Sequence, residues 1–306
     1  MAKFNLVITG ATGFVGQHFL ESIDYNRYNV RIISRSFSKS TWADFSKCEQ
    51  VVADLADVES LKRAFAGQDL VVNIAAEIRN ESMMEASNII GVQNLADAAV
   101  FCQVPKILHL SSVGVVGMQY AAKTVLVDEF YPCDPKNRYE ITKLKSEEIL
   151  SKAAHAGQIN CCILRPTNVF GEHHPFNALL NLCQQLQKGR PAIYSEGAMV
   201  NYVYVKDLVE EIKSAFDSTT NLEIRNVGTA MSLKDFYTLL AQSLSHPNRL
   251  VRIPSFLIRL FRSVGINKLN AISNKVEYVP HNSSLSFGVE EGIKRSILFY
   301  KSKGVL

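Results

Sequence analysis

The 306-residue sequence lacks several features that would place it in a specialised class of protein. It has no block of five or six like charges and a formal net charge of only +4, so nothing in it indicates a nucleic-acid partner. No hydrophobic run approaches the length of a membrane span, and the N-terminus carries no signal-peptide pattern. We therefore expect no integral membrane segment and a cytoplasmic location.

The six cysteines lack the spacing of a metal site or of a redox pair. No two of them form C-x-x-C, and Cys161 and Cys162 lie in an apolar run, so we interpret them as small core residues. No cluster of histidine, cysteine and acidic residues has metal-ligand spacing, and no G-x-S-x-G motif indicates a hydrolase. With 47% hydrophobic and 20% charged residues, the composition is that of an ordinary globular protein.

What the sequence does contain is a glycine-rich turn directly after a buried apolar run. The run LVI at 6–8 leads into TGATGFVG at 9–16 and then into a helical pattern. In such a turn the first glycine opens the loop, the second leaves room for a pyrophosphate, and the third lets the helix pack closely. The helix start would bind the phosphates. The alternative is an ordinary strand-to-helix turn. If the turn binds a dinucleotide, the expected contacts are Gly10, Thr12, Gly13, Phe14, Val15 and Gly16.

Strand and helix patterns alternate five times in the first 165 residues. We expect further strands at 30–34, 50–55, 69–76 and 106–112 and a helix over 85–99. This alternation predicts the α/β class, with a Rossmann-type doubly wound parallel sheet over 1–165 and a smaller substrate-binding lobe over 166–306. In the lobe we expect a helix over 179–186 and short strands over 203–207 and 224–228.

The end of the second strand bears on the choice of dinucleotide. A carboxylate there would bind the ribose hydroxyls of NAD, but the chain has Ser34 followed by Arg35. A guanidinium suits the extra phosphate of NADP, so we expect NADP or NAD, with NADP favoured. At the end of the third strand, Asp54 is a candidate contact for the adenine amino group; helix capping is the alternative, and both roles are compatible.

Three residues could carry redox chemistry. Tyr139 and Lys143 are four residues apart and therefore share one helical face. A fixed cation beside a tyrosine lowers the pKa of the phenol from its usual value near 10 and makes it a better base. Ser112, at the end of a strand, would orient the reacting carbonyl or alcohol. The Y-x-x-x-K pattern alone also fits a solvated helix face, so its weight comes from its place in the chain.

These motifs together resemble the extended short-chain dehydrogenase/reductase family, and within it the NAD(P)-dependent sugar-nucleotide epimerase/dehydratase branch. The resemblance covers residues 4–240 in family order, whereas the last 65 residues match nothing usable. Beyond the glycine turn and Asp54, the matching stretches are NIAA at 73–76, Asn88 with Gly91 and Asn94, LSS at 110–112, Tyr139 with Lys143, LRPTNVFG at 164–171, YVYVKD at 202–207 and NVG at 226–228.

The resemblance implies that Tyr139 is the catalytic acid/base, that Lys143 binds the nicotinamide ribose, and that Ser112 assists at the carbonyl. It implies that segments near 200–228 rejoin the cofactor domain and that a homodimer forms through the helices at 88–99 and 139–150. Further expected cofactor contacts are Leu55, Ala75, Ala76, Asn88, Pro166, Asn168 and Val169. Candidate substrate contacts are Glu77, Ser112, Val113, Tyr139, Asn168, His173 (otherwise a surface-loop histidine), Tyr204 and Arg225.

The chain departs from the family pattern at several positions. Val113 and Gly114 stand where dehydratases carry an Asp-Glu pair, so we do not expect dehydration. The usual tyrosine of the same stretch is Val116, which removes a sugar-side contact. Val200 replaces the arginine that in many members grips the nucleotide diphosphate, and Arg225, Arg252 and Arg259 are candidates to replace it.

Three functions are compatible with these residues. The first is an NAD(P)-dependent epimerase or ketoreductase that moves a hydride to or from a ring carbon of a nucleoside-diphosphate sugar. The second is an NADPH-dependent carbonyl reductase of the steroid or flavonoid type, which the missing diphosphate arginine fits. The third is a non-catalytic dinucleotide-binding scaffold, against which the intact Ser112, Tyr139 and Lys143 argue.

Overall fold

The computed structural model describes residues 3–37, 42–118, 120–175, 178–247, 249–254, 256–258, 269–282 and 284–306. Contact clustering divides the chain into two compact units. The first comprises residues 1–117, 133–166 and 209–225, and the second comprises 118–132, 167–208 and 226–306. The segment 118–132 of the second unit lies within the residues predicted to form the cofactor domain. That the units act as cofactor and substrate domains stays a prediction.

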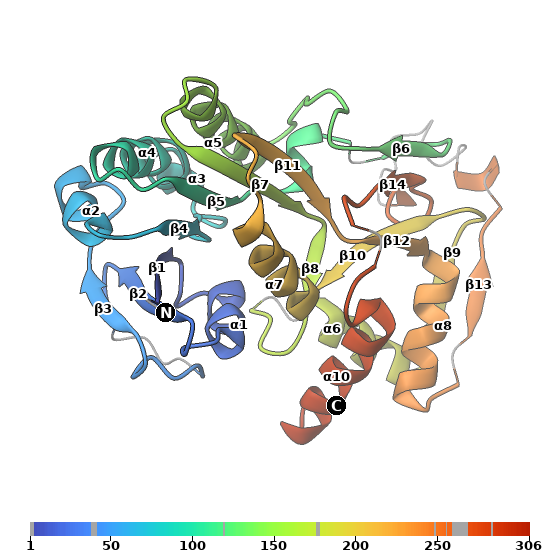
Figure 1. Ribbon diagram of the computed structural model, residues 1–306. Coiled ribbons are helices and arrows are strands. Elements are labelled where there is room, and N and C mark those ends of the chain that lie inside the picture. The colour runs from blue at the N-terminus through green and yellow to red at the C-terminus, as the bar shows by residue number, and fades with distance from the viewer. Residues whose placement is uncertain are drawn as a thin grey trace. The chain divides into compact units, whose positions relative to one another are not determined.

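The first unit is built on a seven-stranded sheet with the order β11-β7-β5-β4-β1-β2-β3 (Figure 1). The neighbouring pairs from β3 through β7 are parallel, which confirms the predicted doubly wound α/β fold. The strand order reverses between β1 and β4, and in such sheets ligands bind at that switch point, beyond the carboxyl ends of the strands. The strands are β1 (Phe4–Thr9), β2 (Tyr28–Ser34), β3 (Glu49–Val52), β4 (Leu70–Asn73), β5 (Lys106–Leu110), β7 (Asn160–Pro166) and β11 (Leu222–Val227).

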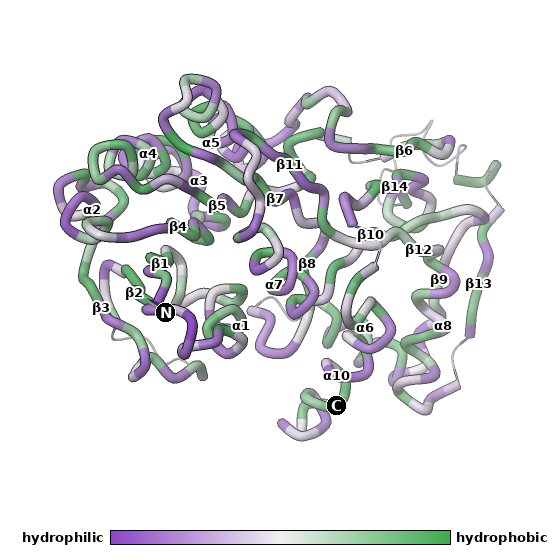
Figure 2. Tube along the Cα trace, viewed as in Figure 1, coloured by the Kyte–Doolittle hydropathy of each residue, from purple (hydrophilic) through white to green (hydrophobic). Residues whose placement is uncertain are grey.

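Helices α2 (Val58–Phe65), α4 (Gly91–Phe101) and α5 (Arg138–His155) cover one face of this sheet (Figure 1). The core between the layers is apolar, and the traces of α4 and α5 carry both hydrophobic and hydrophilic residues (Figure 2). On the other face, Phe19 of α1 (Phe14–Ser22) packs edge-on against Phe216 of the 3-10 turn η3 (Ala215–Asp217) at 6.1 Å between ring centroids. Core residues from strands and helices include Val7, Val71, Ile107, Ile163, Leu61, Leu95 and Leu150.

Among its described residues, the second unit holds a three-stranded sheet, two strand pairs and the helices α6, α8 and α10. The sheet has the order β12-β10-β8, and the pairs are β9 with β13 and β6 with β14. The strands are β6 (Val125–Val127), β8 (Asn168–Phe170), β9 (Ala192–Tyr194), β10 (Met199–Tyr204), β12 (Thr229–Ser232), β13 (Leu250–Arg252) and β14 (Val276–Tyr278). The helices are α6 (Ala178–Gln187), α8 (Leu233–Leu244) and α10 (Gly288–Ser302). In the part of the chain that the structure describes, no helix has the length and apolarity needed to cross a bilayer.

Two expected elements differ from the observed ones. The strand predicted over 203–207 is wrong, because β10 ends at Tyr204 and α7 (Val205–Ser214) begins at the next residue. The buried residues of α7, Val205, Leu208, Val209 and Ile212, follow helical spacing. Five residues are too few to show that spacing in the sequence. The helix predicted over 85–99 is interrupted: α3 (Glu81–Glu85) leads into a π-helical turn, η1 (Ala86–Ile90), before α4 begins.

Candidate active site

The glycine turn after β1 has no room for side chains at two positions. Gly10 has φ +71°, and a Cβ there would lie 2.6 Å from the backbone nitrogen of Ala75. A Cβ on Gly16 would collide with the carbonyl oxygen of Gly10. Glycine at these positions therefore lets α1 and the end of β4 pack directly against the turn, as the sequence analysis expects.

The start of α1 fits a diphosphate. Gly13 is the N-cap residue, so it offers no capping side chain, and the first turn of the helix carries no acidic residue. The positive end of the helix dipole and the first-turn N–H groups are thus left for an anion. Thr12, Phe14 and Val15 around this point are half-buried, and Gly13 is exposed. The residues present fit the predicted phosphate site of a dinucleotide.

On the expected adenosine side, the strand ends are polar. Ser34 donates its hydroxyl hydrogen to the carbonyl of Ser36 at 2.7 Å, and Arg35 is exposed. The capping alternative for Asp54 is wrong: Asp57 caps α2, whereas the carboxylate of Asp54 accepts the turn N–H of Ala56 at 3.0 Å. Contact of Asp54 with adenine stays a prediction, as does that of Leu55, which packs against Gly91.

The loop after β4 is tied to the helices that follow it. Asn88, in the π-helical turn, accepts the N–H of Glu77 at 2.8 Å and donates to its carbonyl at 2.9 Å and to the hydroxyl of Thr142 at 3.1 Å. The carboxylate of Glu77 accepts two N–H groups of its own turn, and these bonds lower its pKa. Asn88 thus holds this loop against α5, with Ala75 half-buried and Ala76 exposed.

The end of β5 packs against the start of α5. Ser112 caps the 3-10 turn η2 (Val113–Val116) by accepting the N–H of Gly114 at 3.0 Å, so its hydroxyl hydrogen is left to donate. A Cβ on Gly114 would lie 3.2 Å from the Ser112 hydroxyl oxygen and 3.1 Å from Cγ of Glu140. The close approach at Gly114 therefore brings the Ser112 loop to the helical turn that carries Tyr139. Val113 itself is buried.

Tyr139 lies in the first turn of α5, which Asn137 caps. Its ring is half-buried, and its hydroxyl has no hydrogen-bond partner among the described residues. Burial, and then the charge of Glu140, raise its pKa to about 12. This differs from the lowered pKa that the sequence predicts, because the nearby lysine is engaged elsewhere.

Lys143 is almost completely buried, and its ammonium points to β5. Its Nζ donates to the carbonyl of Leu110 at 2.6 Å and lies 3.2 Å from Nε2 of His109. Burial lowers its pKa to about 8, and the carboxylate of Glu147 opposes that shift. Lys143, one turn after Tyr139 on α5, was expected to act on the phenol. Its ammonium is instead bonded to β5.

A buried ion pair beneath these residues escaped the sequence analysis. Glu147 of α5 and Arg165 of β7 meet at 2.6 Å, and both side chains are only 4% exposed. Ser111 donates to the same carboxylate at 2.5 Å. A charged residue at the end of an apolar strand, as Arg165 is, was the signal that could have indicated such a pair.

The remaining candidates lie in less accessible or already bonded positions. Tyr204 is fully buried and donates to the carboxylate of Glu172 at 2.9 Å, so a substrate contact would need its ring uncovered. Arg225, in the first unit, is bonded to Glu223 at 2.8 Å and lies 3.8 Å from Glu211.

In the second unit, the ring of His173 packs against Phe299 with centroids 4.4 Å apart, and Asn168 donates to the Asn201 carbonyl at 3.0 Å. Val169 is half-buried in β8, and Pro166 is buried at the end of β7. These roles stay predictions. Arg259, one alternative for the diphosphate, lies outside the described residues. Arg252 pairs with Glu196 at 2.9 Å.

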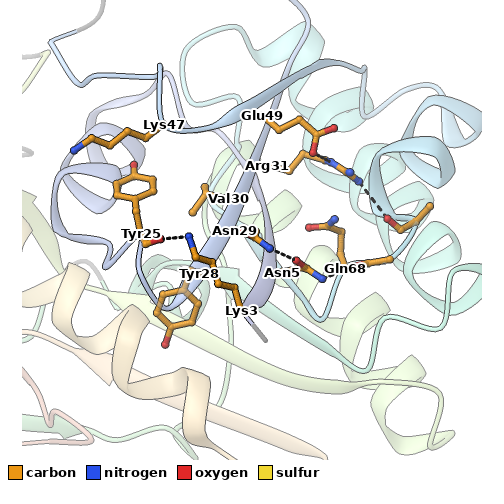
Figure 3. A pocket seen from close by; sticks show the side chains of 12 residues that line it. Lys3, Asn5, Tyr25, Tyr28, Asn29, Val30, Arg31, Lys47, Glu49 and Gln68 are labelled. Carbon is orange, nitrogen blue, oxygen red and sulfur yellow. Dashed lines mark hydrogen bonds and ion pairs between the residues drawn. The ribbon is translucent and has the colours of Figure 1, made fainter. Parts of the chain in front are cut away.

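A hollow of about 540 Å³ lies at the opposite edge of the sheet, where β1 and β2 begin (Figure 3). Three basic residues line it: Arg31 is paired with Glu49 at 2.8 Å, Lys3 bonds the carbonyl of Tyr25, and Lys47 lies over the Tyr25 ring. It is separate from the carboxyl ends of the strands, so it does not belong to the predicted site. Among the described residues, no group of three or more metal-ligating side chains could hold a metal ion.

Comparison with known proteins decides the family. The model of the NAD dependent epimerase/dehydratase family matches residues 6–228, which is most of the chain. The chain belongs to that family. The resemblance seen in the sequence is thereby confirmed, and a nicotinamide dinucleotide is the cofactor on which this family depends.

Relatives within and around this family carry different activities. The chain is 32% identical over 218 residues to an N-acetyl-alpha-D-glucosaminyl-diphospho-ditrans,octacis-undecaprenol 4-epimerase of Escherichia coli, covering 68% of this chain and 62% of that protein. It is 25% identical over 290 residues to a 3beta-hydroxysteroid-dehydrogenase/decarboxylase (isoform 2) of Arabidopsis thaliana, covering 82% of this chain and 50% of that one. The match thus spans less than two thirds of either relative.

Solved structures agree on the fold of this epimerase/dehydratase family member. A UDP-glucose 4-epimerase of Thermotoga maritima, solved with UDP-glucose, superposes with a TM-score of 0.77 over 98% of this chain and 99% of that one. The sequence identity is 20%, so the likeness concerns the fold.

Proposed function

We propose that the protein is an NAD(P)-dependent epimerase that acts on a ring carbon of a nucleoside-diphosphate sugar. The observation that supports the proposal is the close approach of the Ser112 loop, at the end of β5, to the first turn of α5, which carries Tyr139 and, one turn later, Lys143. Ser112 retains a hydrogen to donate, the hydroxyl of Tyr139 is free of protein partners among the described residues, and Lys143 supplies a buried cation. C4 is the ring carbon to test first, because two of the compared proteins are 4-epimerases.

The proposed chemistry is a reversible oxidation of an alcohol. Ser112 donates a hydrogen bond to the sugar oxygen, and the Tyr139 phenolate takes the proton of that hydroxyl as the carbon loses its hydride. The bound dinucleotide supplies the hydride acceptor and a positive charge. The same tyrosine returns the proton when the hydride adds to the other face of the ketone. A phenol whose pKa is about 12 needs a nearby positive charge to ionise, and since Lys143 is bonded to β5, the charge of the bound nicotinamide would supply it.

We infer NADP as the better-bound dinucleotide, on Ser34 and Arg35. No carboxylate ends β2, and the exposed Arg35 is available to a 2′-phosphate. The solved neighbours that contain a named cofactor contain NAD, so both dinucleotides belong in the assay.

The test is turnover of UDP-glucose and UDP-N-acetylglucosamine by the purified protein and by Tyr139→Phe, followed by NMR of the product sugars. Loss of general acid/base catalysis typically costs 10²–10⁴-fold, so we expect roughly that loss in the variant. Unchanged turnover in Tyr139→Phe would contradict the catalytic assignment and favour a scaffold. The undecaprenyl-diphosphate sugar named for the Escherichia coli relative is a further substrate for the panel, since it shares the sugar diphosphate.

A second candidate is an NADPH-dependent carbonyl reductase on a steroid- or flavonoid-like substrate. The Arabidopsis relative favours it, as does Val200 in place of the diphosphate arginine. A reductase consumes NADPH with every turnover, whereas an epimerase consumes none, so cofactor consumption separates the two. Net oxidation or reduction of a sterol panel, with no epimerisation of nucleotide sugars, is the result that this candidate predicts.

Assembly and compartment belong to the same proposal. We infer a homodimer through the helix at 88–99, which comprises the end of η1 and most of α4, and through α5; Ile90 of η1 and Ile141 of α5 are 51% and 40% exposed. We infer a cytoplasmic location from six free cysteines, four of them buried, none of which is in a disulfide. Light scattering of the wild type and of Ile141→Glu, with Leu298→Glu as an exposed control outside that face, tests the dimer.

A further inference from the structure

His109 is a buried histidine to which the sequence analysis assigns no role. It lies on β5, three residues before Ser112, and its side chain is fully buried between β4 and α5. Its Nδ1 is 2.9 Å from the amide nitrogen of Asn73, and its Nε2 is 3.0 Å from the hydroxyl of Ser146 and 3.2 Å from Nζ of Lys143.

The surrounding hydrogen bonds fix which ring nitrogen carries the proton. Thr9 accepts the N–H of Ala75 at 3.1 Å and donates its own hydrogen to Oδ1 of Asn73 at 2.6 Å. Asn73 therefore turns its NH₂ group to His109, so Nδ1 of the ring accepts. Burial, and then the charge of Lys143, hold the pKa of His109 well below its usual range. The ring is neutral, and its proton lies on Nε2.

That proton position determines what Lys143 meets. The Nε2–H donates to Ser146, whose hydroxyl donates in turn to the carbonyl of Lys143 at 2.6 Å. An Nε2 that carries a hydrogen cannot accept one from the ammonium. Lys143 therefore donates to the carbonyl of Leu110, and its positive charge faces the positive end of an N–H dipole.

We propose that His109 is a positioning residue for Lys143: fixed as the Nε2–H tautomer by Thr9 and Asn73, it directs the lysine onto Leu110 and disfavours its charged form. Its consequence for catalysis rests on the proposed function. The proton position and the lysine ionisation are properties of the protein without substrate.

The other groups that act on Lys143 are known from the structure. Glu147, one turn on along α5, favours the charged lysine but is itself bridged to Arg165 of β7. Tyr139 lies one turn earlier on α5. From β5 the titratable group is His109. A change in the polarity of His109 alone should therefore be visible in the ionisation of Lys143.

Asn73→Asp inverts that polarity with almost no change of shape. The carboxylate still accepts from Thr9 but now presents an acceptor to Nδ1 of His109. The ring then carries its proton on Nδ1, and Nε2 becomes an acceptor for Lys143. Ser146→Ala is the matched control, because it removes a partner of Nε2 and leaves the amide donor of Asn73 in place.

The experiment is ¹⁵N NMR of protein labelled at its histidines and lysines, with His109→Gln used to assign the His109 signals. We expect a neutral Nε2–H ring in the wild type and in Ser146→Ala between about pH 6 and pH 9, and an Nδ1–H ring in Asn73→Asp. We also expect Lys143 to lose its proton at least one pH unit higher in Asn73→Asp. A wild-type ring protonated on Nδ1, or charged near pH 6, would overturn the proposal.

Structural damage and failure of the function give different results. Because the new carboxylate by itself also favours the charged lysine, a shift of the Lys143 ionisation counts for the proposal only together with the change of tautomer. A purely structural His109 predicts a lower melting temperature in Asn73→Asp with the ring still protonated on Nε2, which also overturns the proposal. If Asn73→Asp does not fold, the wild-type tautomer decides. If no nucleotide sugar is turned over, the proposed function fails. The NMR experiment still tests the His109 tautomer and the Lys143 ionisation, because neither depends on substrate.

Discussion

Replacing Lys143 by methionine should change how the stability of the fold depends on pH. The pKa of the buried lysine is lowered from 10.5 to about 8. Below pH 8 the lysine is protonated in both the folded and the unfolded chain, and the fold bears the whole cost of burying its charge. Between pH 8 and 10.5 the folded protein releases the proton while the unfolded chain keeps it, so the free energy of unfolding rises with pH.

The size of this effect follows from the shift. At about 1.4 kcal/mol per pKa unit, the contribution of Lys143 rises by about 3 kcal/mol from neutral pH to the end of that window. Methionine fills a similar volume and does not titrate. The unfolding free energy of the wild type minus that of Lys143→Met should therefore rise with pH by about 3 kcal/mol, most of it by pH 10.

Denaturant unfolding of both proteins over this pH range measures the difference. Buried cysteines and tyrosines, whose pKa values are raised, make both proteins less stable at high pH, but they are common to both and cancel. The pKa of His109 is already far below the window. A difference that stays flat with pH, or falls, would refute a lysine that burial holds at a lowered pKa.

Two further predictions concern residues around the site. Arg35→Ala should weaken NADP binding about tenfold, because one exposed phosphate contact is lost, and should leave NAD binding unchanged. Calorimetry with both dinucleotides measures this, and equal losses for both would contradict a phosphate contact. Arg165→Met leaves Glu147 buried without its cation and should cost about 3–5 kcal/mol of unfolding free energy, whereas the double variant with Glu147→Gln should recover much of it; a loss below about 1 kcal/mol would show that the pair is not buried as described.

The sequence predicts the fold of the first unit well because its signals are local. Gly10 and Gly16 are required by close backbone contacts within the turn and with the end of β4. The strands of a parallel sheet are short apolar runs. The spacing of Tyr139 and Lys143 likewise fixes their common helix face.

What escaped prediction depends on partners far along the chain. The lysine one turn after Tyr139 was expected to act on the phenol, but its ammonium donates to the Leu110 carbonyl and lies beside His109 on β5, and nothing near Lys143 in sequence reveals this. Arg225 was a candidate for a diphosphate, yet it is bonded to Glu223, two residues earlier on β11, and lies 3.8 Å from Glu211 of α7. Of these two contacts, only that with Glu211 requires strand and helix to meet.

The central claim is that a sugar carbon gives up its hydride to the bound dinucleotide and takes it back while Tyr139 moves the proton. The direct measurement is turnover of a nucleotide sugar carrying deuterium on C4, with NMR or mass spectrometry of the product epimer. We predict that the epimer keeps the deuterium and that Tyr139→Phe forms almost none of it. Replacement of that deuterium by solvent hydrogen, or epimer formed at the wild-type rate by Tyr139→Phe, would contradict the account.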